Sequence, residues 1–440
     1  MWNPFLESLP LVKLRKIQLR KVKRIINWAW RNSSFYREKL DRSGVVPKDI
    51  QTLDDLRSIP LTKKSEWLES QGSNTWDFGT NLAVPESDLI RYHQTSGTTG
   101  KPVRLAFSTR DWNSWLECWG YGLSACNLTA KDRVLVCFPF NLFVGWWGGQ
   151  DAARLLGCRV YSGGGMSTGD RLKVIREHRI TTLMGAPSYL LRMGLHTGSK
   201  GEFNARVLGV KKLICGAEPG GSIPSMRKRL EEAWNAEVFD HLGASEVGPW
   251  GYECSFHPGG VHICESFFFL EFLDPETLQP ARAGELSRVV ITALEKFSQP
   301  VIRWDLKDLV RVSKSSCPCG RSFRWLEGGI LGRTDDLIKI RGVLLSPRAI
   351  EDVVQTFDEI LEYRVVISEI RGMDELTIQV GTRLLDTARD FLFQKLEMAL
   401  KDRTHLRFKS QLLEEGALSK NEVKIRRVKD LRKEGELNCD

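Results

Sequence analysis

Short apolar runs alternate with amphipathic stretches from about residue 88 to residue 245. The runs include DRVLVCFPF, LGCRVYSGG, ITTLMGAP, KKLICGAEP and AEVFDHLGAS. Between them, Gly169 to His178 and Ile223 to Ala233 place apolar residues at helical spacing. Strands that alternate with helices predict a layered α/β domain whose strands are largely parallel. In such domains the loops that follow the carboxyl ends of the strands usually carry the chemistry.

The pattern differs on either side of this region. Residues 10–70 are charged and helical in character, and SSFYREKL opens on serines that suit a helix cap. Residues 262–312 contain alternating runs such as ELSRVVITAL, which predict an antiparallel or barrel-like β subdomain. Beyond about residue 333, short strand-like runs surround the helical pattern PRAIEDVVQTF and a long helix from Leu385 to Arg403. This last part predicts a compact α+β unit.

Together these patterns predict an α/β protein in two parts. A large N-terminal layered α/β domain at 1–333 includes the barrel-like β subdomain, and a small α+β domain occupies 334–440. The length of 440 residues agrees with this division, because it exceeds the size that one hydrophobic core usually supports. Hydrophobic residues at 42% and charged residues at 27% exclude a disordered or collagenous chain.

Charge and cysteine content narrow the classes of partner. The net charge of +9 suits an anionic substrate such as ATP or coenzyme A. The basic residues concentrate at Lys13 to Arg24 and Lys420 to Lys433, and the first group shares a helix with an apolar stripe, so we expect a solvated face and no nucleic-acid partner. The start of the chain does not read as a secretory signal, and Val134 to Gly149 is too short for a membrane span. We therefore expect a cytoplasmic protein whose ten cysteines are thiols or metal ligands.

The segment HQTSGTTGKP at 93–102 is rich in glycine and hydroxyl side chains. It is not a Walker phosphate loop, because Thr95 stands where the first glycine is needed and Pro102 follows the Gly-Lys pair. Glycines nevertheless let backbone N–H groups approach phosphate oxygens, while hydroxyls donate hydrogen bonds and lysine adds positive charge. A flexible polar turn is the alternative. The candidate phosphate-binding residues are Ser96, Gly97, Thr98, Thr99, Gly100 and Lys101.

Further segments follow this loop in a characteristic order. They are FPFNLFVGWWGG, CGAEPG, HLGASEVGP, VIRWDLKDLV, GRTDDLIKIRGVLLSP and NEVKIRRVKD. With the loop, they give the chain a resemblance to the phenylacetate-coenzyme A ligase branch of the adenylate-forming (acyl/aryl-CoA ligase) superfamily, which includes capsule-biosynthesis-type relatives. The resemblance spans nearly the whole sequence, and the matches are specific as a set.

The resemblance implies a reaction in two steps. A carboxylate attacks the α-phosphate of ATP to give an acyl-adenylate and pyrophosphate, and a thiol, usually that of coenzyme A, then displaces AMP. It also implies that the C-terminal domain is mobile and rotates about a hinge at Asp335. The aromatic residues of the acyl-pocket segment favour a planar acid of the aryl type or similar, because a flat slot accepts flat rings.

Site residues follow from the same resemblance. Glu246 would be the magnesium-associated glutamate and Lys424 the catalytic lysine, with Lys420 as its rival. Asp308 would accept hydrogen bonds from the ribose hydroxyls, with Asp305 as the near alternative. Nucleotide-binding roles are implied for the loop residues and for Gly216, Ala217, Glu218, Pro219, Asp240, His241 and Ser245. Acyl-group contacts are implied for Phe143, Ala217 and Gly243.

The sequence departs from the family pattern at three places. Leu242 stands where the family has a tyrosine before Gly243, which removes an aromatic surface for the base. The segment around Lys424 lacks the usual glycine before the lysine. The family's Tyr-Gly-Tyr-Gly is FPFN at 138–141, so the acyl pocket differs in shape, although Trp146 and Trp147 are expected to be core residues.

A group of cysteines and histidines predicts a zinc site. CPCG at 317–320 is a tight turn with two thiolates, and YECSFHPGGVHIC adds Cys254 with two histidines. Three sulfurs and one imidazole satisfy tetrahedral Zn²⁺, and some members of this branch carry such a structural zinc. The expected ligands are Cys254, His262, Cys317 and Cys319. His257 is the alternative histidine, and free thiols are the alternative to a metal site.

Three functions remain open at this point. The first is an acyl-coenzyme A ligase that uses ATP, Mg²⁺, coenzyme A and a carboxylic acid, as a monomer or a homodimer. The second is an adenylating enzyme that transfers the acyl group to another acceptor. The third is an inactive basic binding protein, which salt-sensitive binding of DNA or RNA without pyrophosphate exchange would reveal.

Overall fold

The protein is described by a computed structural model. It describes residues 1–72, 77–95, 101–198, 201, 203–341, 343–370, 373–413 and 427–433. The chain divides into two compact units, Met1–Ile330 and Leu331–Asp440. Each unit has its own hydrophobic core. In the described part of the chain, no helix combines the length and apolar content that crossing a membrane requires.

The first unit is built on a large sheet whose described strands run in the order β13-β9-β8-β7-β6-β5-β3-β4. The strands β3 to β7 are parallel, and β8, β9 and β13 continue the sheet in antiparallel pairing. Their bounds are β3 Arg133–Val136, β4 Arg159–Ser162, β5 Thr182–Gly185, β6 Lys212–Cys215, β7 Glu237–Ala244, β8 Gly248–Glu253, β9 Gly260–Ile263 and β13 Trp325–Glu327. The parallel strands confirm the α/β prediction.

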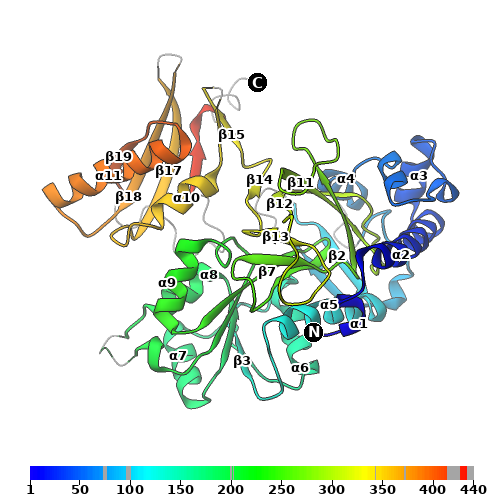
Figure 1. Cartoon of the computed structure of the whole chain (residues 1–440), viewed down its shortest axis with the longest axis horizontal. Coiled ribbons are helices and arrows are strands. Elements are labelled where there is room, and N and C mark those ends of the chain that lie inside the picture. The colour runs from blue at the N-terminus through cyan, green and yellow to red at the C-terminus, as the bar shows by residue number, and fades with distance from the viewer. Residues whose placement is uncertain are drawn as a thin grey trace. The chain divides into compact units, whose positions relative to one another are not determined.

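Helices cover both faces of the parallel strands (Figure 1). Successive residues of a strand point to opposite faces. Val134 and Val136 therefore join the core that includes α5 and α6, whereas Leu135 joins the core of α7, α8 and α9. The bounds are α5 Thr109–Ala125, α6 Gly145–Leu155, α7 Thr168–Glu177, α8 Pro187–Gly194 and α9 Pro224–Trp234.

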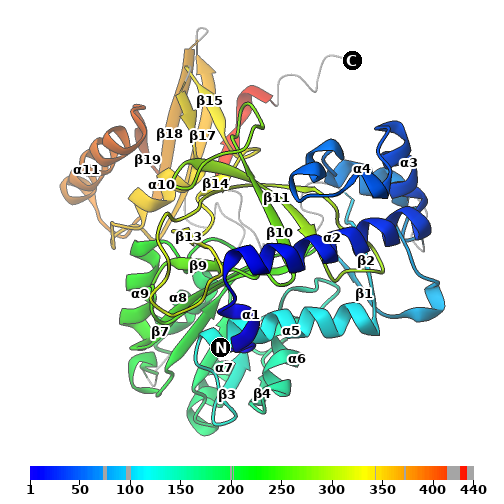
Figure 2. The same cartoon turned by 45° about the vertical axis from the view of Figure 1, so that its right-hand side comes forward.

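A second sheet in this unit contains β10 Phe268–Leu273, β11 Leu286–Ala293 and β12 Trp304–Arg311, which pair antiparallel. The antiparallel pairing was expected, but in the described residues these strands form an open sheet and not a closed barrel. Helix α2 packs on it (Figure 2). Gln18 of α2 donates hydrogen bonds to the carbonyls of Glu265 and Phe268, at 2.8 and 3.1 Å. The N-terminal helices are α1 Pro4–Glu7, α2 Leu11–Asn32, α3 Ser34–Arg42 and α4 Lys64–Gln71.

A hairpin precedes the large sheet. Its strands are β1 Leu89–Gln94 and β2 Arg104–Ser108, with Gln94 opposite Arg104. Thr95 closes the base of the connecting loop, because its N–H donates to the carbonyl of Val103 at 3.0 Å and its hydroxyl accepts from the N–H of Val103 at 3.0 Å. The candidate phosphate loop therefore connects the two strands of a β-hairpin.

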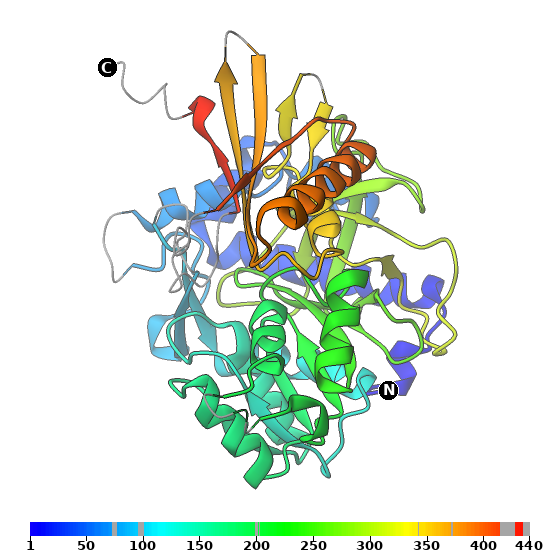
Figure 3. The same cartoon turned by 90° about the vertical axis from the view of Figure 1, so that its left-hand side faces the viewer.

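The second unit is an α+β fold. Its main sheet has the order β19-β18-β17-β20, with α10 and α11 contributing to the same core (Figure 3). The long helix predicted from Leu385 is α11. The bounds are β14 Gly332–Arg333, β15 Ile338–Ile340, β16 Val343–Leu345, α10 Pro347–Val354, β17 Glu362–Ile370, β18 Met373–Gly381, α11 Asp386–Thr404, β19 Lys409–Leu412 and β20 Val428–Asp430.

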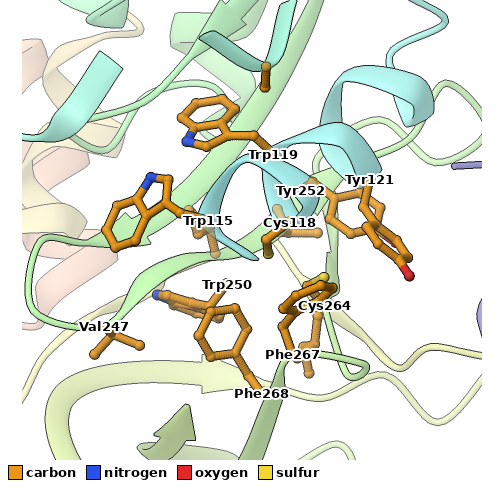
Figure 4. Close-up of a cluster of buried hydrophobic side chains, with 14 of the residues drawn as sticks. Trp115, Cys118, Trp119, Tyr121, Val247, Trp250, Tyr252, Cys264, Phe267 and Phe268 are labelled. Carbon is orange, nitrogen blue, oxygen red and sulfur yellow. The ribbon is translucent and has the colours of Figure 1, made fainter. Parts of the chain in front are cut away.

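Tryptophans fill the core between α5 and the β8 region of the first unit (Figure 4). Trp115 and Trp119, one helical turn apart on α5, turn their indole nitrogens towards the same space. Gly148 of α6 fits there because a Cβ would lie 2.5 Å from Trp115 Nε1 and 2.7 Å from Trp119 Nε1. Glycine is thus required for the close packing of α5 against α6.

Candidate active site

Several residues of the predicted nucleotide site lie at the carboxyl ends of β6 and β7. Cys215, the last residue of β6, lies opposite Asp240 in the parallel register. The turn 216–219 follows β6, and the segment from His241 to Glu246 lies at the end of β7. Parallel strands bring both segments to one edge of the sheet, which is where α/β proteins usually bind ligands.

Ala217 adopts a left-handed backbone conformation, with φ of 73°. A residue with a Cβ pays roughly 1 kcal/mol or more for this conformation, so such positions often belong to functional turns. Ala217 and Pro219 are exposed, whereas the Glu218 carboxylate accepts a hydrogen bond from the N–H of Ser188 at 2.9 Å. Gly216 is buried between the carbonyl of His241 and the ring of Trp146, which a Cβ would meet at 3.0 and 3.4 Å. The turn is therefore held by Ser188 at Glu218 and by His241 and Trp146 at Gly216.

Asp240 belongs to a buried polar network. Its carboxylate accepts a hydrogen bond from the Ser222 hydroxyl at 2.5 Å, and its N–H donates to Glu253 at 2.8 Å. Glu253 in turn makes a bidentate ion pair with Arg227, at 2.6 and 2.5 Å. Burial raises the pKa of Glu253 to about 8, against the opposing effect of Arg227 and of backbone N–H donors. Asp240 is thus held in place by Ser222 and Glu253, and Glu253 is itself held by Arg227 of α9.

Glu246 is 8% exposed and contacts two lysines. Lys64 of α4 forms an ion pair with its carboxylate, with Nζ 3.0 Å from Oε1. Lys296 donates to its backbone carbonyl. Lys296 is buried, and its ammonium group lies 5.5 Å from the ring centres of both Trp67 and Phe107. Burial lowers the pKa of Lys296 to about 8, although Asp111 and Glu246 favour its charged form.

Lys296 also connects two predicted parts of the site. Phe107 lies on β2, the strand that follows the candidate phosphate loop, and Glu246 follows β7. Because one ammonium group contacts both, the hairpin and the Glu246 segment are neighbours in the first unit. Of the loop itself, Lys101 is exposed, and Ser96, Gly97, Thr98, Thr99 and Gly100 lie outside the described residues.

Two aspartates compete for the ribose role on β12. Asp305 forms a bidentate ion pair with Arg288, whose Nε lies 2.8 Å from Oδ1. Asp308 is also buried, at 6% exposed, and interacts with other groups. The partner of Asp305 is thus a side chain of the neighbouring strand, which makes it less available to a ligand.

A row of aromatic side chains borders the turn after β6. Phe143 and Phe138 have ring centres 5.8 Å apart, and Phe138 and Trp146 have ring centres 6.5 Å apart. Trp146 contacts Trp119 at 5.6 Å, and Trp119 stacks on His241. We call these five residues the aromatic row. Trp146 is 3% exposed, as expected of a core residue, and Phe143 is half-buried.

Cys254, His262, Cys317 and Cys319 come together, and their ligand atoms all lie within 4.8 Å of one another. Cys254 directly follows β8, His262 lies on β9, and the other two lie between β12 and β13. His262 Nδ1 is 3.1 Å from the carbonyl of Phe323, which directs Nε2 towards Cys319 at 3.4 Å. Side-chain hydrogen bonds from Cys254 and His262 lower the pKa of the Cys319 thiol. His257 instead packs on Trp325, with ring centres 4.1 Å apart.

The sequence matches known proteins along most of its length. Residues 33–284 match the family described as AMP-binding enzyme, and residues 342–432 match its C-terminal domain. The chain belongs to the AMP-binding enzyme family. A phenylacetate-coenzyme A ligase of Thermus thermophilus is 31% identical over 98% of this chain and 100% of its own length. The corresponding Escherichia coli protein is 29% identical over 97% of each chain.

A solved structure agrees with this assignment to the adenylate-forming superfamily. A 2-hydroxyisobutyryl-CoA ligase in the postadenylation state, in complex with 2-HIB-AMP, superposes with a TM-score of 0.91 and 26% identity, over 99% of this chain and 93% of that one. The predicted family and fold class are thus confirmed. Anthranilate CoA ligase in complex with anthranoyl-AMP, at 17% identity and a TM-score of 0.59, shares the fold.

Some predicted residues of this AMP-binding enzyme lie elsewhere or outside the description. Gly243 is exposed and Ser245 half-buried, both at the end of β7. Asp335, in the second unit, pairs with Arg333 at 3.0 Å. Lys424 and its rival Lys420 lie outside the described residues. Sequence reasoning missed the two lysines at Glu246, although the position of Lys296 close behind the apolar run VVITAL and directly before Phe297 was a signal for a buried charge.

Proposed function

We propose that this AMP-binding enzyme is an AMP-forming acid–thiol ligase that acts on an aryl or similar carboxylic acid and on coenzyme A. In the first step a carboxylate oxygen attacks the α-phosphorus of ATP, and the bond to pyrophosphate breaks. In the second step the thiol, as it loses its proton, attacks the acyl carbon, and the bond to AMP breaks. The names of the relatives and the complex with 2-HIB-AMP support both steps.

One observation carries the proposal. Lys296 joins the strand after the phosphate loop to Glu246, and Glu246 shares a sheet edge with the turn 216–219 and Asp240. A triphosphate held by the loop would therefore lie beside Glu246, with its adenosine near the turn. The reaction brings two anions together, so fixed positive charge and hydrogen-bond donors near the phosphates are its main requirement.

Each predicted residue then has a role. Ser96 to Lys101 hold the phosphates, the turn with Asp240 and His241 borders the adenine, and Asp308 binds the ribose hydroxyls. Glu246 and phosphate oxygens would hold Mg²⁺, a hard cation that prefers oxygen ligands and neutralises phosphate charge when bound. Phe143, Ala217 and Gly243 contact the acyl group.

The C-terminal part completes the site in this proposal. The adenylation domain covers 1–333, and the domain at 334–440 swings about Asp335 to bring Lys424 to the carboxylate and α-phosphate. The compact units that meet at residue 330 support a division near this point. The reaction belongs in the cytoplasm, where ATP and coenzyme A are available, and a homodimer is compatible with it.

Cys254, His262, Cys317 and Cys319 are proposed to hold a structural Zn²⁺. They offer three sulfurs and one imidazole, the donor set of a tetrahedral zinc site, with ligand atoms within 4.8 Å of one another, and the Nδ1 contact to Phe323 leaves Nε2 for the metal. A closed site of four protein ligands leaves no position for a substrate. Bound there, the metal would tie β8 and β9 to the segment before β13.

ATP–pyrophosphate exchange tests the proposal. Purified full-length protein is given ATP, Mg²⁺ and a panel of aryl and short-chain acids, and thioester formation is then measured with and without coenzyme A. We expect acid-dependent exchange and, with coenzyme A, stoichiometric AMP and acyl-CoA. Exchange without acyl-CoA would favour another acceptor. No exchange with any acid, together with salt-sensitive nucleic-acid binding, would favour the inactive binding protein.

A further inference from the structure

Helix α2 carries a row of basic side chains on its outer surface. Its 22 residues include eight lysines and arginines but no aspartate or glutamate. Five of the basic residues are exposed and follow one another at intervals of three, four, four and seven positions, which places them on one face of the helix. We call this the basic face of α2, and it consists of Lys13, Lys16, Arg20, Arg24 and Arg31.

The opposite face of α2 is fixed inside the first unit. Leu14, Val22 and Ile25 are fully buried in its cores, and the buried Gln18 is hydrogen-bonded to two backbone carbonyls beside β10. The helix therefore cannot turn its apolar stripe outwards. The basic face stays at the surface of the unit, where α2 is seen along its whole length (Figure 2).

Most of the basic face has no carboxylate to neutralise it. Glu295 pairs with Arg24 of this face at 2.6 Å, but it is shared with Lys21 at 2.9 Å. No described residue forms an ion pair with Lys13, Lys16 or Arg20. The first half of α2 therefore presents a positive potential to the solvent, which attracts polyanions.

Exposed apolar side chains lie at the N-terminal end of the basic face. Val12 is 72% exposed and precedes Lys16 by one helical turn, so the two side chains share a face. Leu11 is also exposed, and so is Phe5 of the preceding helix α1, at 70%. In a membrane, an apolar layer lies directly beneath charged headgroups. Apolar side chains followed by a row of cations are complementary to both layers of such a surface.

We propose that the basic face of α2, together with Val12 and Phe5, binds the surface of an anionic membrane. The lipid headgroups compensate Lys13, Lys16 and Arg20, and the two apolar side chains enter the layer beneath them. Lipids diffuse laterally, so their headgroups can align with a straight row of cations about 27 Å long. Nucleic acid would also compensate the cations, but its phosphates offer no apolar layer.

Sedimentation with lipid vesicles tests this binding in the full-length protein. Vesicles of phosphatidylcholine alone are compared with vesicles that also contain about 30% phosphatidylserine. ATP and acid are left out, so the result does not depend on the ligase reaction. We expect binding to the anionic vesicles only, with most of it lost at about 0.5 M salt because ions screen the charges. Equal binding to both kinds of vesicle, or binding to neither, would overturn the inference.

Charge reversal shows whether the basic face is responsible. A basic residue near an anionic membrane strengthens binding about fivefold, so the triple variant Lys13→Glu, Lys16→Glu, Arg20→Glu should bind about a hundredfold more weakly or worse. A matched control makes the same change in net charge at three exposed positions around α6 and β4, with Lys131→Glu, Arg154→Glu and Arg159→Glu. Similar losses in both triple variants would mean that net charge alone drives binding, which would overturn the assignment to α2.

A second variant separates a membrane from other polyanions. Phe5→Ser combined with Val12→Ser should bind anionic vesicles about threefold more weakly or worse, because less apolar surface enters the lipid, and should bind heparin as the native protein does. Unchanged vesicle binding by this variant, with equally tight binding of duplex DNA by the native protein, would make nucleic acid the partner and refute the inference. Melting temperatures check that every variant is folded. Where a charge reversal lowers the melting temperature, the corresponding glutamine variants give the same comparison with half the change in charge.

Discussion

Replacement of Glu246 by glutamine tests the centre of the proposed site. The substitution keeps the size of the side chain and keeps the backbone carbonyl that accepts from Lys296. It removes one negative charge from a residue that is 8% exposed and ion-paired with Lys64 at 3.0 Å. Any effect thus reports on the charge of the carboxylate and not on its packing.

The expected effects on stability and on catalysis differ in size. The Lys64 side chain is 44% exposed, so water can solvate its ammonium group once the pair is lost. An ion pair of this kind contributes about 1 kcal/mol at most. If Glu246 instead helps to hold the cation at the triphosphate, its loss should reduce adenylation by about a hundredfold or more, which corresponds to roughly 3 kcal/mol.

Acid-dependent pyrophosphate exchange and urea unfolding measure the two effects separately. Glu276→Gln serves as the matched control, because Glu276 is an exposed residue of the turn after β10. We expect Glu246→Gln to unfold near the native midpoint and to lose exchange, with partial recovery as Mg²⁺ is raised. Exchange within threefold of the native rate would refute the role of this carboxylate, and a large loss of stability would refute the estimate for the ion pair.

Three further predictions concern metal, packing and pH. Purified protein should contain about one zinc per chain, and Cys319→Ala should lose it and melt several degrees lower, as metal analysis and calorimetry would show. Gly148→Ala should destabilise by about 1–3 kcal/mol in urea unfolding, because its Cβ meets two rigid indoles, whereas Gly169→Ala, with nothing nearer than 3.9 Å, should be neutral or stabilising. Lys296 has a pKa of about 8 in the folded protein against an ordinary 10.5, so between these pH values the unfolded chain binds more protons than the folded one. The stability of the native protein should therefore rise with pH across this window, relative to that of Lys296→Met, by up to about 3 kcal/mol. A parallel pH dependence of the two proteins would contradict this.

Much of the fold was readable from the sequence because its signals are local. Short apolar runs separated by amphipathic stretches predicted β3 to β7 and the helices α7 and α9. The proximity of Cys254, His262, Cys317 and Cys319 could also be predicted, since thiolates and imidazoles at short spacings have few other uses in such turns, whereas zinc binding by these residues stays a prediction. The sequence does not show which of His257 and His262 lies beside the cysteines, whereas the structure places His262 there. His257 packs on Trp325 instead, a contact between the turn that precedes β9 and the first residue of β13, which sequence spacing does not predict.

The interactions that shape the site could not be predicted in the same way. Lys64 and Lys296 are far from Glu246 in sequence, and only the packing of α4 and of the segment after β11 brings them there. The left-handed conformation of Ala217 is likewise hidden, because alanine gives no signal for positive φ. An antiparallel segment was correctly expected at 262–312, but alternation alone does not say whether strands close into a barrel.

The acidic residues of the site pose an electrostatic problem that the long-range contacts address. Asp240 and Glu246 lie where a tetra-anionic nucleotide is proposed to bind, and unpaired carboxylates there would repel it. Ser222 and the Arg227–Glu253 pair engage Asp240, and Lys64 engages the carboxylate of Glu246. Of these partners, Lys64 alone is partly exposed, so water can solvate its ammonium group when it separates from the Glu246 carboxylate. Breaking this ion pair therefore costs little free energy. The buried network is therefore suited to holding the site in shape, whereas the Lys64 pair is suited to opening when a cation arrives with the nucleotide.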